Sequence, residues 1–124
     1  MRLRTIFSTI LFLLPFYLSA HITGTYELNG FDPDTNQSYT GTVVIERQRA
    51  IYTATWTFDG GNTDIGTGVR KDDSISFVFL ESNSNTAGVQ LYEIDGHTLK
   101  GPWARFGATR RGFEKLKKVE RPSS

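Results

Sequence analysis

Apolar residues and threonines alternate in the stretch IYTATWTF, residues 51–58, and this alternation constrains the fold more than any other feature. Tyr52, Ala54 and Trp56 fall on one side of such a strand, and three threonines fall on the other. Successive side chains of a β-strand point to opposite faces, so the pattern predicts a strand with one buried face. The large rings on that face predict that it packs into a core.

Seven further runs are rich in β-forming residues, and turn-forming Gly, Asp and Asn residues separate them. Short strands at even spacing are typical of an all-β sandwich or barrel, and short links favour antiparallel neighbours. We therefore predict an all-β antiparallel meander of about eight strands, either a small up-and-down barrel or a barrel-like sandwich. The predicted strands are Ile22–Leu28, Tyr39–Arg47, Ile51–Phe58, Asp64–Arg70, Ser74–Leu80, Ala87–Ile94, His97–Ala104 and Gly112–Val119.

Alternation in these runs also predicts which side chains face the core. The run 64–70 is ambiguous, because Ile65, Thr67 and Val69 look inward while the two glycines between them could face either way. Pro102 cannot donate a ladder hydrogen bond, which predicts an edge or a bulge and imperfect closure near the C-terminus. The other predicted inward residues are Ile22, Gly24, Tyr26, Leu28, Tyr39, Gly41, Val43, Ile45, Phe58, Ile75, Phe77, Phe79, Leu99, Gly101 and Trp103.

The N-terminal segment has the order of a secretory signal. Two arginines come first, a largely apolar run follows from Ile6 to Leu18, and the small residue Ala20 ends the segment. We predict a signal peptide over 1–20 that is cleaved after Ala20, a single β-barrel domain over 21–119 and a flexible tail over 120–124. The mature protein is then secreted or periplasmic and has no transmembrane segment. An uncleaved N-terminal anchor is the alternative.

The residue inventory argues against catalysis. The chain has no cysteine, which excludes disulfides, thiol catalysis and thiolate metal sites. It also lacks a Gly-x-Ser-x-Gly elbow, a His-x-x-x-His pair and a glycine-rich loop that leads into a helix. We therefore predict that the protein is not an enzyme and uses no cofactor.

The segment Asp32-Pro33-Asp34-Thr35-Asn36 has the alternating oxygen ligands that can open a calcium loop. Such a loop needs Gly at its sixth position and Glu at its twelfth, but Gln37 and Val43 stand there. Pro33 and the Asx residues suit a turn instead. We predict no metal site, and if the domain has a ligand-facing rim, this connection is a candidate for part of it.

Charge is distributed unevenly along the chain. Acidic residues outnumber basic ones between His21 and Leu99, and basic residues dominate from Lys100 onward. The simpler interpretation is a solvated charge run, and the alternative is a basic surface for an anionic partner. Nucleic acid is not expected for an exported protein with an acidic majority. The candidate partner-binding residues are Arg110, Arg111, Lys115, Lys117 and Lys118.

Aromatic side chains supply candidates for a binding cavity. They either fill the core of a narrow barrel or line a pocket for a small apolar molecule. Glu114 shares a face with Leu116, so it is either an internal strut that needs an Arg or a Tyr hydroxyl, or a binding group. The candidate ligand-binding residues are Tyr26, Tyr39, Trp56, Phe77, Tyr92, Trp103 and Glu114.

A series of short motifs, in order along the chain, resembles a family of small secreted bacterial β-domains, some members of which carry a fibronectin-binding label. The resemblance implies an exported binding domain with an extracellular protein partner. The motifs are Gly24-Thr25-Tyr26, Pro33-Asp34, Tyr39-Thr40-Gly41-Thr42-Val43, Tyr52 with Trp56, Gly66-Thr67-Gly68, Tyr92-Glu93-Ile94-Asp95-Gly96, Leu99-Lys100-Gly101-Pro102-Trp103 and Gly112-Phe113-Glu114-Lys115-Leu116.

A looser resemblance is to the calycins, the lipocalin and avidin-like barrels, which open with Gly-x-Trp and place a basic residue over that ring. Gly24-Thr25-Tyr26 is similar to that opening. The resemblance implies that Arg105, Arg110 or Arg111 stacks over the Tyr26 ring. Together these features predict a non-catalytic secreted or periplasmic binding module for a small apolar molecule or a protein. The alternative is an adhesion or inhibitor protein that acts through the basic C-terminal face.

Overall fold

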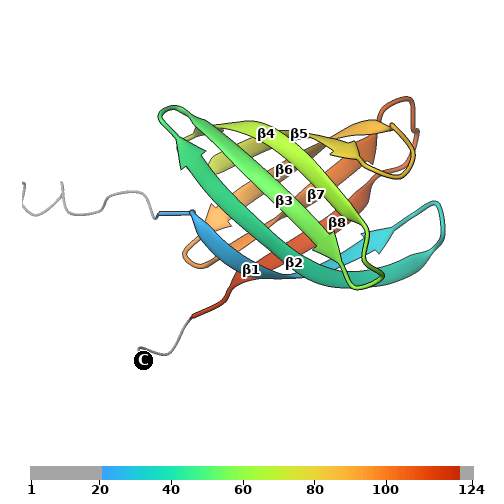
Figure 1. The fold of residues 1–124 in the computed structure, drawn as a ribbon, viewed down its shortest axis with the longest axis horizontal. Helices are drawn as coiled ribbons and strands as arrows, with labels where there is room; N and C mark the ends of the chain where they lie inside the picture. The colour runs from blue at the N-terminus through green and yellow to red at the C-terminus, as the bar shows by residue number, and fades with distance from the viewer. Residues whose placement is uncertain (1–20, 121–124) are drawn as a thin grey trace, which may run out of the picture.

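The computed structural model describes residues 21–120, so the predicted signal peptide and residues 121–124 lie outside the described residues. Eight antiparallel strands follow one another around a closed barrel, and the last strand pairs with the first (Figure 1). The predicted all-β meander is confirmed, in its barrel form. The strands are β1 Gly24–Asp32, β2 Gln37–Gln48, β3 Ile51–Phe58, β4 Thr63–Lys71, β5 Ser74–Glu81, β6 Ala87–Asp95, β7 Thr98–Arg105 and β8 Gly112–Lys118.

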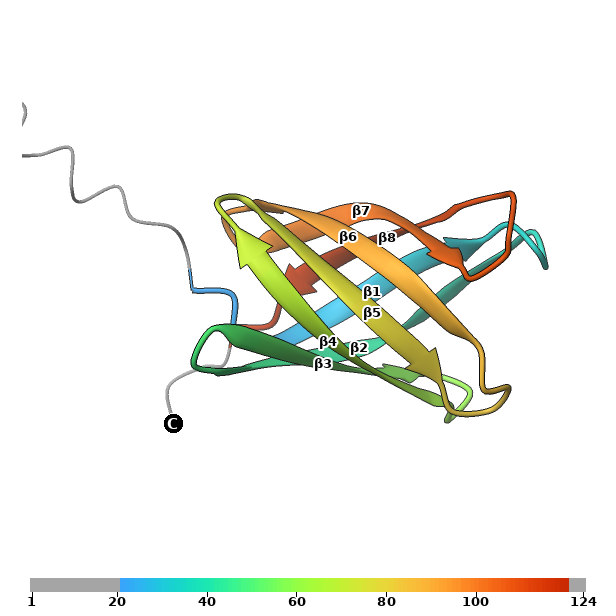
Figure 2. The same cartoon turned by 90° about the horizontal axis from the view of Figure 1, so that it is seen from above.

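The two ends of the barrel differ. At one end, which we call the mouth, the four loops 33–36, 59–62, 82–86 and 106–111 leave the strands on the right in Figures 1 and 2. Residues 21–23 pack at the opposite end, which we call the closed end. There Ile22 is almost fully buried, the Tyr26 hydroxyl donates to the Ile22 carbonyl at 2.7 Å, and Lys118 Nζ donates to the His21 carbonyl at 3.1 Å. The described residues include no helix that is long and apolar enough to span a membrane.

The core occupies the barrel interior, as the alternation predicts for β2, β3, β5 and β7. Tyr26 and Leu28 of β1, Ile75 and Phe77 of β5, and Leu99 of β7 are all buried. Large apolar side chains fill most of the interior, and rings of neighbouring strands occupy the space beside inward glycines such as Gly66 and Gly88. The exception is the mouth.

The inward face of β4, which the sequence leaves ambiguous, carries the glycines and not Ile65, Thr67 and Val69. Ile65 and Val69 are 56% and 60% exposed on the outer wall, whereas Asp64, Gly66 and Gly68 face inward. A Cβ on Gly66 would lie 2.8 Å from the Trp56 ring, and a Cβ on Gly68 would lie 2.6 Å from the Phe77 ring. The glycines therefore leave space for aromatic rings of the neighbouring strands, and apolar residues lie outside instead.

Pro102 interrupts the pairing of β6 and β7 but does not open the barrel. No ladder pairs join Leu91 to Pro102 or Tyr92 to Gly101, although the register on both sides of the gap is unchanged. The side-chain amide of Gln90 donates to the carbonyls of Leu91, Gly101 and Pro102 at 3.1–3.2 Å. The predicted edge or bulge is wrong, because β7 pairs on both sides and no extra residue is inserted. The expected imperfect closure is also wrong, because β8 pairs with both β7 and β1.

Candidate functional site

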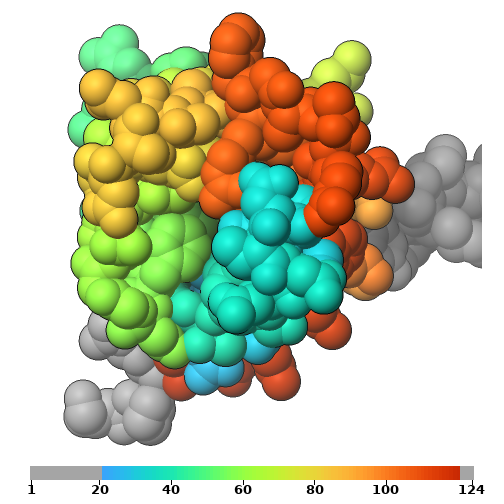
Figure 3. Space-filling view, turned by 90° about the vertical axis from the view of Figure 1, so that its right-hand side faces the viewer, coloured from blue at the N-terminus to red at the C-terminus, as the bar shows by residue number. Residues whose placement is uncertain are grey.

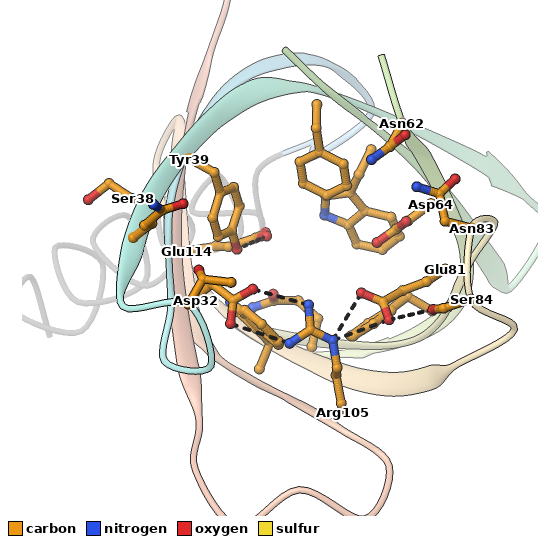
Figure 4. Close-up of a pocket in the computed structure, with 17 residues that line it drawn as sticks. Asp32, Ser38, Tyr39, Asn62, Asp64, Glu81, Asn83, Ser84, Arg105 and Glu114 are labelled. Atoms are coloured by element: carbon orange, nitrogen blue, oxygen red, sulfur yellow. Dashed lines mark hydrogen bonds and ion pairs between the residues drawn. The ribbon is translucent and has the colours of Figure 1, made fainter. Parts of the chain in front are cut away.

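A cavity of about 270 Å³ opens at the mouth of the barrel. The mouth loops surround this end of the molecule (Figure 3). Strands contribute the walls and the floor, and the side chains converge from opposite sides of the barrel (Figure 4). Cavities at barrel mouths are a common location for small-molecule binding.

Aromatic rings form the wall of the cavity. Tyr39 contacts Phe58 and Trp103 edge to face, with ring centroids 5.5 and 6.4 Å apart. Phe79 contacts Trp56 and Trp103 in the same way, at 6.1 and 6.3 Å. Such edge-to-face pairs fix ring orientation and add about 0.5–1.5 kcal/mol each beyond area burial. The wall is therefore held in shape without a ligand.

The floor of the cavity is a hydrogen-bonded network around Glu114. The Tyr39 hydroxyl donates to Oε2 of Glu114 and the Tyr92 hydroxyl donates to Oε1, both at 2.6 Å. Trp56 Nε1 in turn donates to the Tyr92 hydroxyl at 3.0 Å. Glu114 is only 4% exposed. The sequence predicts a tyrosine partner for this carboxylate, and two tyrosines fill that role.

Burial controls the acidity of this network. Burial raises the pKa of Glu114, and the two tyrosine donors oppose that rise without cancelling it. The pKa values of Tyr39 and Tyr92 are also raised, first by burial and then by the charge of Glu114. Both hydroxyls therefore stay protonated at neutral pH and keep donating to the carboxylate.

Arg105 joins three acidic side chains at the rim. It donates to both carboxylate oxygens of Asp32 at 3.2 and 3.3 Å, to Asp34 at 2.8 Å and, through Nε, to Glu81 at 3.1 Å. The same guanidinium lies 5.0 Å from the centroid of the Trp103 ring. These contacts connect the ends of β1, β5 and β7 with the turn after β1.

The Asp32–Asn36 segment is a turn, as predicted, but the loop is shorter than the sequence indicates. β1 continues to Asp32, which pairs with Gln37 of β2, so only residues 33–36 form the turn. Oδ1 of Asp32 accepts the backbone N–H of Asp34 at 2.9 Å, the geometry of an Asx turn. Burial raises the pKa of Asp32, but the hydrogen bonds from Arg105 and the Asp34 backbone bring it below its ordinary value.

Within residues 21–120, no group of three or more acidic or histidine side chains is arranged to hold a metal ion.

Asp64 is the exceptional acid of the cavity. It is 9% exposed, and its side chain points into the cavity (Figure 4). No described residue donates a hydrogen bond to it or forms an ion pair with it. Burial, followed by the charges of Glu81 and Glu114, raises the pKa of Asp64 to about 6, and Arg105 lowers it only in part.

Of the predicted ligand-binding residues, the structure brings Tyr39, Trp56, Trp103 and Glu114 together around the cavity. The other three, Tyr26, Phe77 and Tyr92, do not line it. Tyr26 is buried at the closed end, Phe77 is packed between Trp56 and Tyr92, and Tyr92 supports Glu114 from below the floor. These three rings fill the core.

The predicted partner-binding residues do not form one surface. Arg110 and Arg111 lie in the 106–111 loop at the mouth, while Lys115 and Lys117 lie on the outer face of β8. Lys118 is occupied at the closed end, where it donates to the His21 carbonyl.

The expected calycin-like stack over Tyr26 is also absent from the described residues. Arg105 stacks on Trp103 instead, at the opposite end of the barrel from Tyr26. The calycin resemblance therefore implied a cation that does stack on a ring, but the ring is Trp103 and not the Tyr26 of the opening motif.

No protein-family model matches the chain, and no curated protein matches it in sequence. A solved structure that resembles it is a de novo designed fluorescence-activating β-barrel. The two chains superpose with a TM-score of 0.58 at 16% sequence identity, over 78% of this chain and 93% of the designed one. At that identity the likeness concerns the fold, and it supports the small up-and-down barrel.

Proposed function

We propose that the protein is a non-catalytic, exported binding module that takes a small molecule into the mouth cavity. The observation that carries the proposal is the contrast between the two ends of the barrel. Ile22 and Tyr26 fill the closed end, whereas the mouth keeps an open cavity with a preformed aromatic wall. A rigid apolar concavity with a few convergent polar groups is the usual form of a small-molecule site. The signal-like sequence of residues 1–20 supports a secreted or periplasmic location.

The size of the cavity limits the ligand. A volume of about 270 Å³ equals the liquid volume of about nine water molecules. It lies slightly below the range of about 300–1,000 Å³ that is typical for drug-sized ligands. The ligand is therefore a small ring compound, or the end group of a larger molecule.

The bonding of the acids supports binding over catalysis. Both oxygens of Glu114 accept tyrosine hydroxyls, and the carboxylates of Asp32 and Glu81 are held by Arg105. These three side chains position the wall and the rim. They act as structural supports, which corresponds to the strut interpretation of Glu114.

Intrinsic fluorescence tests the proposal, because both tryptophans of the chain, Trp56 and Trp103, line the cavity. We expect a saturable emission change when small aromatic molecules are added. Asn62→Phe, which fills part of the mouth, should weaken binding. Asn29→Phe, on the outer face of β1, is the matched control and should bind normally. A response that is the same in all three proteins would contradict binding in the cavity.

A protein partner on the outer wall is the second candidate, and one observation favours it. Lys100 and Lys115 lie directly opposite each other on β7 and β8, and Lys117 is nearby on the same outer face. Like charges in this position repel, and an anionic partner would relieve the repulsion. Such a surface would serve the adhesion or inhibitor function and the extracellular partner that the sequence resemblance implies. Binding that is weakened by salt and by Lys115→Glu would support it, and binding indifferent to both would exclude this surface.

A further inference from the structure

Asp64 distinguishes the cavity from an ordinary apolar pocket. The other three acids that line it have donors, since Arg105 binds Asp32 and Glu81, and two tyrosines bind Glu114. Asp64 has no donor among residues 21–120, although it is more than nine-tenths buried and points into the cavity. A buried carboxylate without a partner is unfavourable, and it is normally paired or neutralised.

The strand register gives Asp64 no donor from the neighbouring strands. On one side Asp64 lies opposite Trp56 of β3, and on the other it lies opposite Glu81 of β5. An indole ring and a second acid are therefore its cross-strand neighbours, and like charges in that position repel. Arg105 is the one cation among the cavity-lining residues, and its N–H groups are directed to Asp32, Asp34 and Glu81.

These observations determine which ligand charge the cavity favours. Acidic side chains outnumber basic ones around the opening, so the local potential is negative and attracts cations. Aromatic faces also attract cations, and Trp is the strongest such partner. An apolar ligand would exclude solvent from Asp64 without donating a hydrogen bond to it, and a neutral hydroxyl would supply a donor but no charge. An ammonium ligand would supply both the charge and the donors.

We propose that the mouth cavity selects a small primary ammonium compound, whose charged group binds the Asp64 carboxylate and whose apolar body packs against the aromatic wall. This inference rests on the proposed binding function and specifies the ligand class. Asp64 is the specificity-determining residue, and Trp56 is the ring beside the charged group. Glu81, Glu114, Asp32 and Arg105 are the other charged groups that face the cavity.

The test compares probes of one shape and different charge. Benzylammonium and phenethylammonium are titrated at pH 7.5 beside neutral benzyl alcohol and anionic benzoate, with calorimetry and tryptophan fluorescence as readouts. A charge-assisted hydrogen bond in a desolvated site should make the ammonium probes at least about tenfold tighter than the neutral one. Asp64→Asn should remove this preference, and Asp73→Asn, in an exposed turn at the closed end, should keep it.

The possible results separate the two proposals. If the neutral probe binds as tightly as the ammonium probes, or if Asp64→Asn keeps the preference, the ammonium inference is wrong while the cavity function stands. If neither ammonium probe binds at millimolar concentration, the ammonium inference is also wrong. If neither the neutral nor the charged probes alter the tryptophan emission, both the ammonium inference and the proposed binding function of the cavity are wrong. The melting temperature of Asp64→Asn confirms that the variant is folded.

Discussion

The hydroxyl of Tyr39 on β2 donates to the carboxylate of Glu114 on β8 at 2.6 Å, so one hydrogen bond connects the wall of the cavity to its floor. Strands β2 and β8 are not neighbours, since β1 lies between them. The bond therefore braces the barrel across its interior. It also keeps one oxygen of a buried carboxylate satisfied.

Tyr39→Phe should lower the free energy of unfolding. The ring and its edge-to-face contacts stay, but the Glu114 carboxylate loses one of its two tyrosine donors. Loss of a buried hydrogen bond to a charged group costs about 1–3 kcal/mol. Urea denaturation measures the change. Tyr52→Phe is the control, because no described residue hydrogen-bonds to the Tyr52 hydroxyl, and equal losses in both variants would contradict the bracing role.

Asp64→Asn should stabilise the protein at neutral pH. The pKa of Asp64 is raised from 3.8 to about 6, so the folded state holds its proton more tightly than the unfolded state does. The stability of the wild-type protein should therefore fall as pH rises from about 4 to about 6, by on the order of 1–3 kcal/mol from this group. The variant should lack this fall. Urea midpoints at pH 3.5 and pH 7 measure it, and a gain at pH 7 no larger than at pH 3.5 would contradict the burial of an unpaired carboxylate.

Arg105→Ala should destabilise the mouth and loosen the cavity. Asp32 and Glu81, whose side chains are 17% and 18% exposed, would keep their charges without a cationic partner. We expect a loss of about 1–3 kcal/mol in the free energy of unfolding, because charged hydrogen bonds in a partly buried site are removed. Arg105→Lys should recover little of it, since an ammonium group cannot reproduce the fork that holds both acids. Arg110→Ala, in the exposed mouth loop, is the control and should have almost no effect.

Gly66→Ala should destabilise the barrel because the interior there has no space for a methyl group. Its Cβ would lie 2.7 Å from the Val78 carbonyl oxygen and 2.8 Å from the Trp56 ring. Overpacking of this kind costs about 1–3 kcal/mol. Gly60→Ala is the matched control, since a Cβ there meets nothing within 4 Å. Thermal denaturation should separate the two variants, and a shift in Trp56 emission should accompany the first.

The fold was predictable because the alternation is strict where large side chains alternate with threonine, as in Ile51–Phe58. Alternation of apolar and polar residues did not identify the inward face of β4, because glycines occupy the inward positions there and apolar residues face outward. A glycine has no side chain to reveal its face, and the rings that fill its space come from β3 and β5. Asp64 was missed for the same reason. It lies on the same face of β4 as Gly66 and Gly68, so it is predicted to point inward only if the glycines do.

The candidate site was predictable only in part. Tyr39, Trp56, Trp103 and Glu114 follow from aromatic content and alternation. The contacts of Arg105 do not, because Asp32 and Glu81 are distant from it in sequence and meet it only when the barrel closes. Nor does local sequence show which end of a barrel is filled, since that depends on how Ile22 packs against the barrel end.

The most direct test of ligand binding at the mouth is a two-dimensional ¹H–¹⁵N NMR titration with benzylammonium. The indole N–H signals of Trp56 and Trp103, together with the backbone signals around Asp64, should move and saturate together. Signals from Ile22 and Tyr26 at the closed end should stay in place. Shifts confined to the closed end or to the outer wall, or no saturable shift at either indole, would contradict a binding cavity at the mouth.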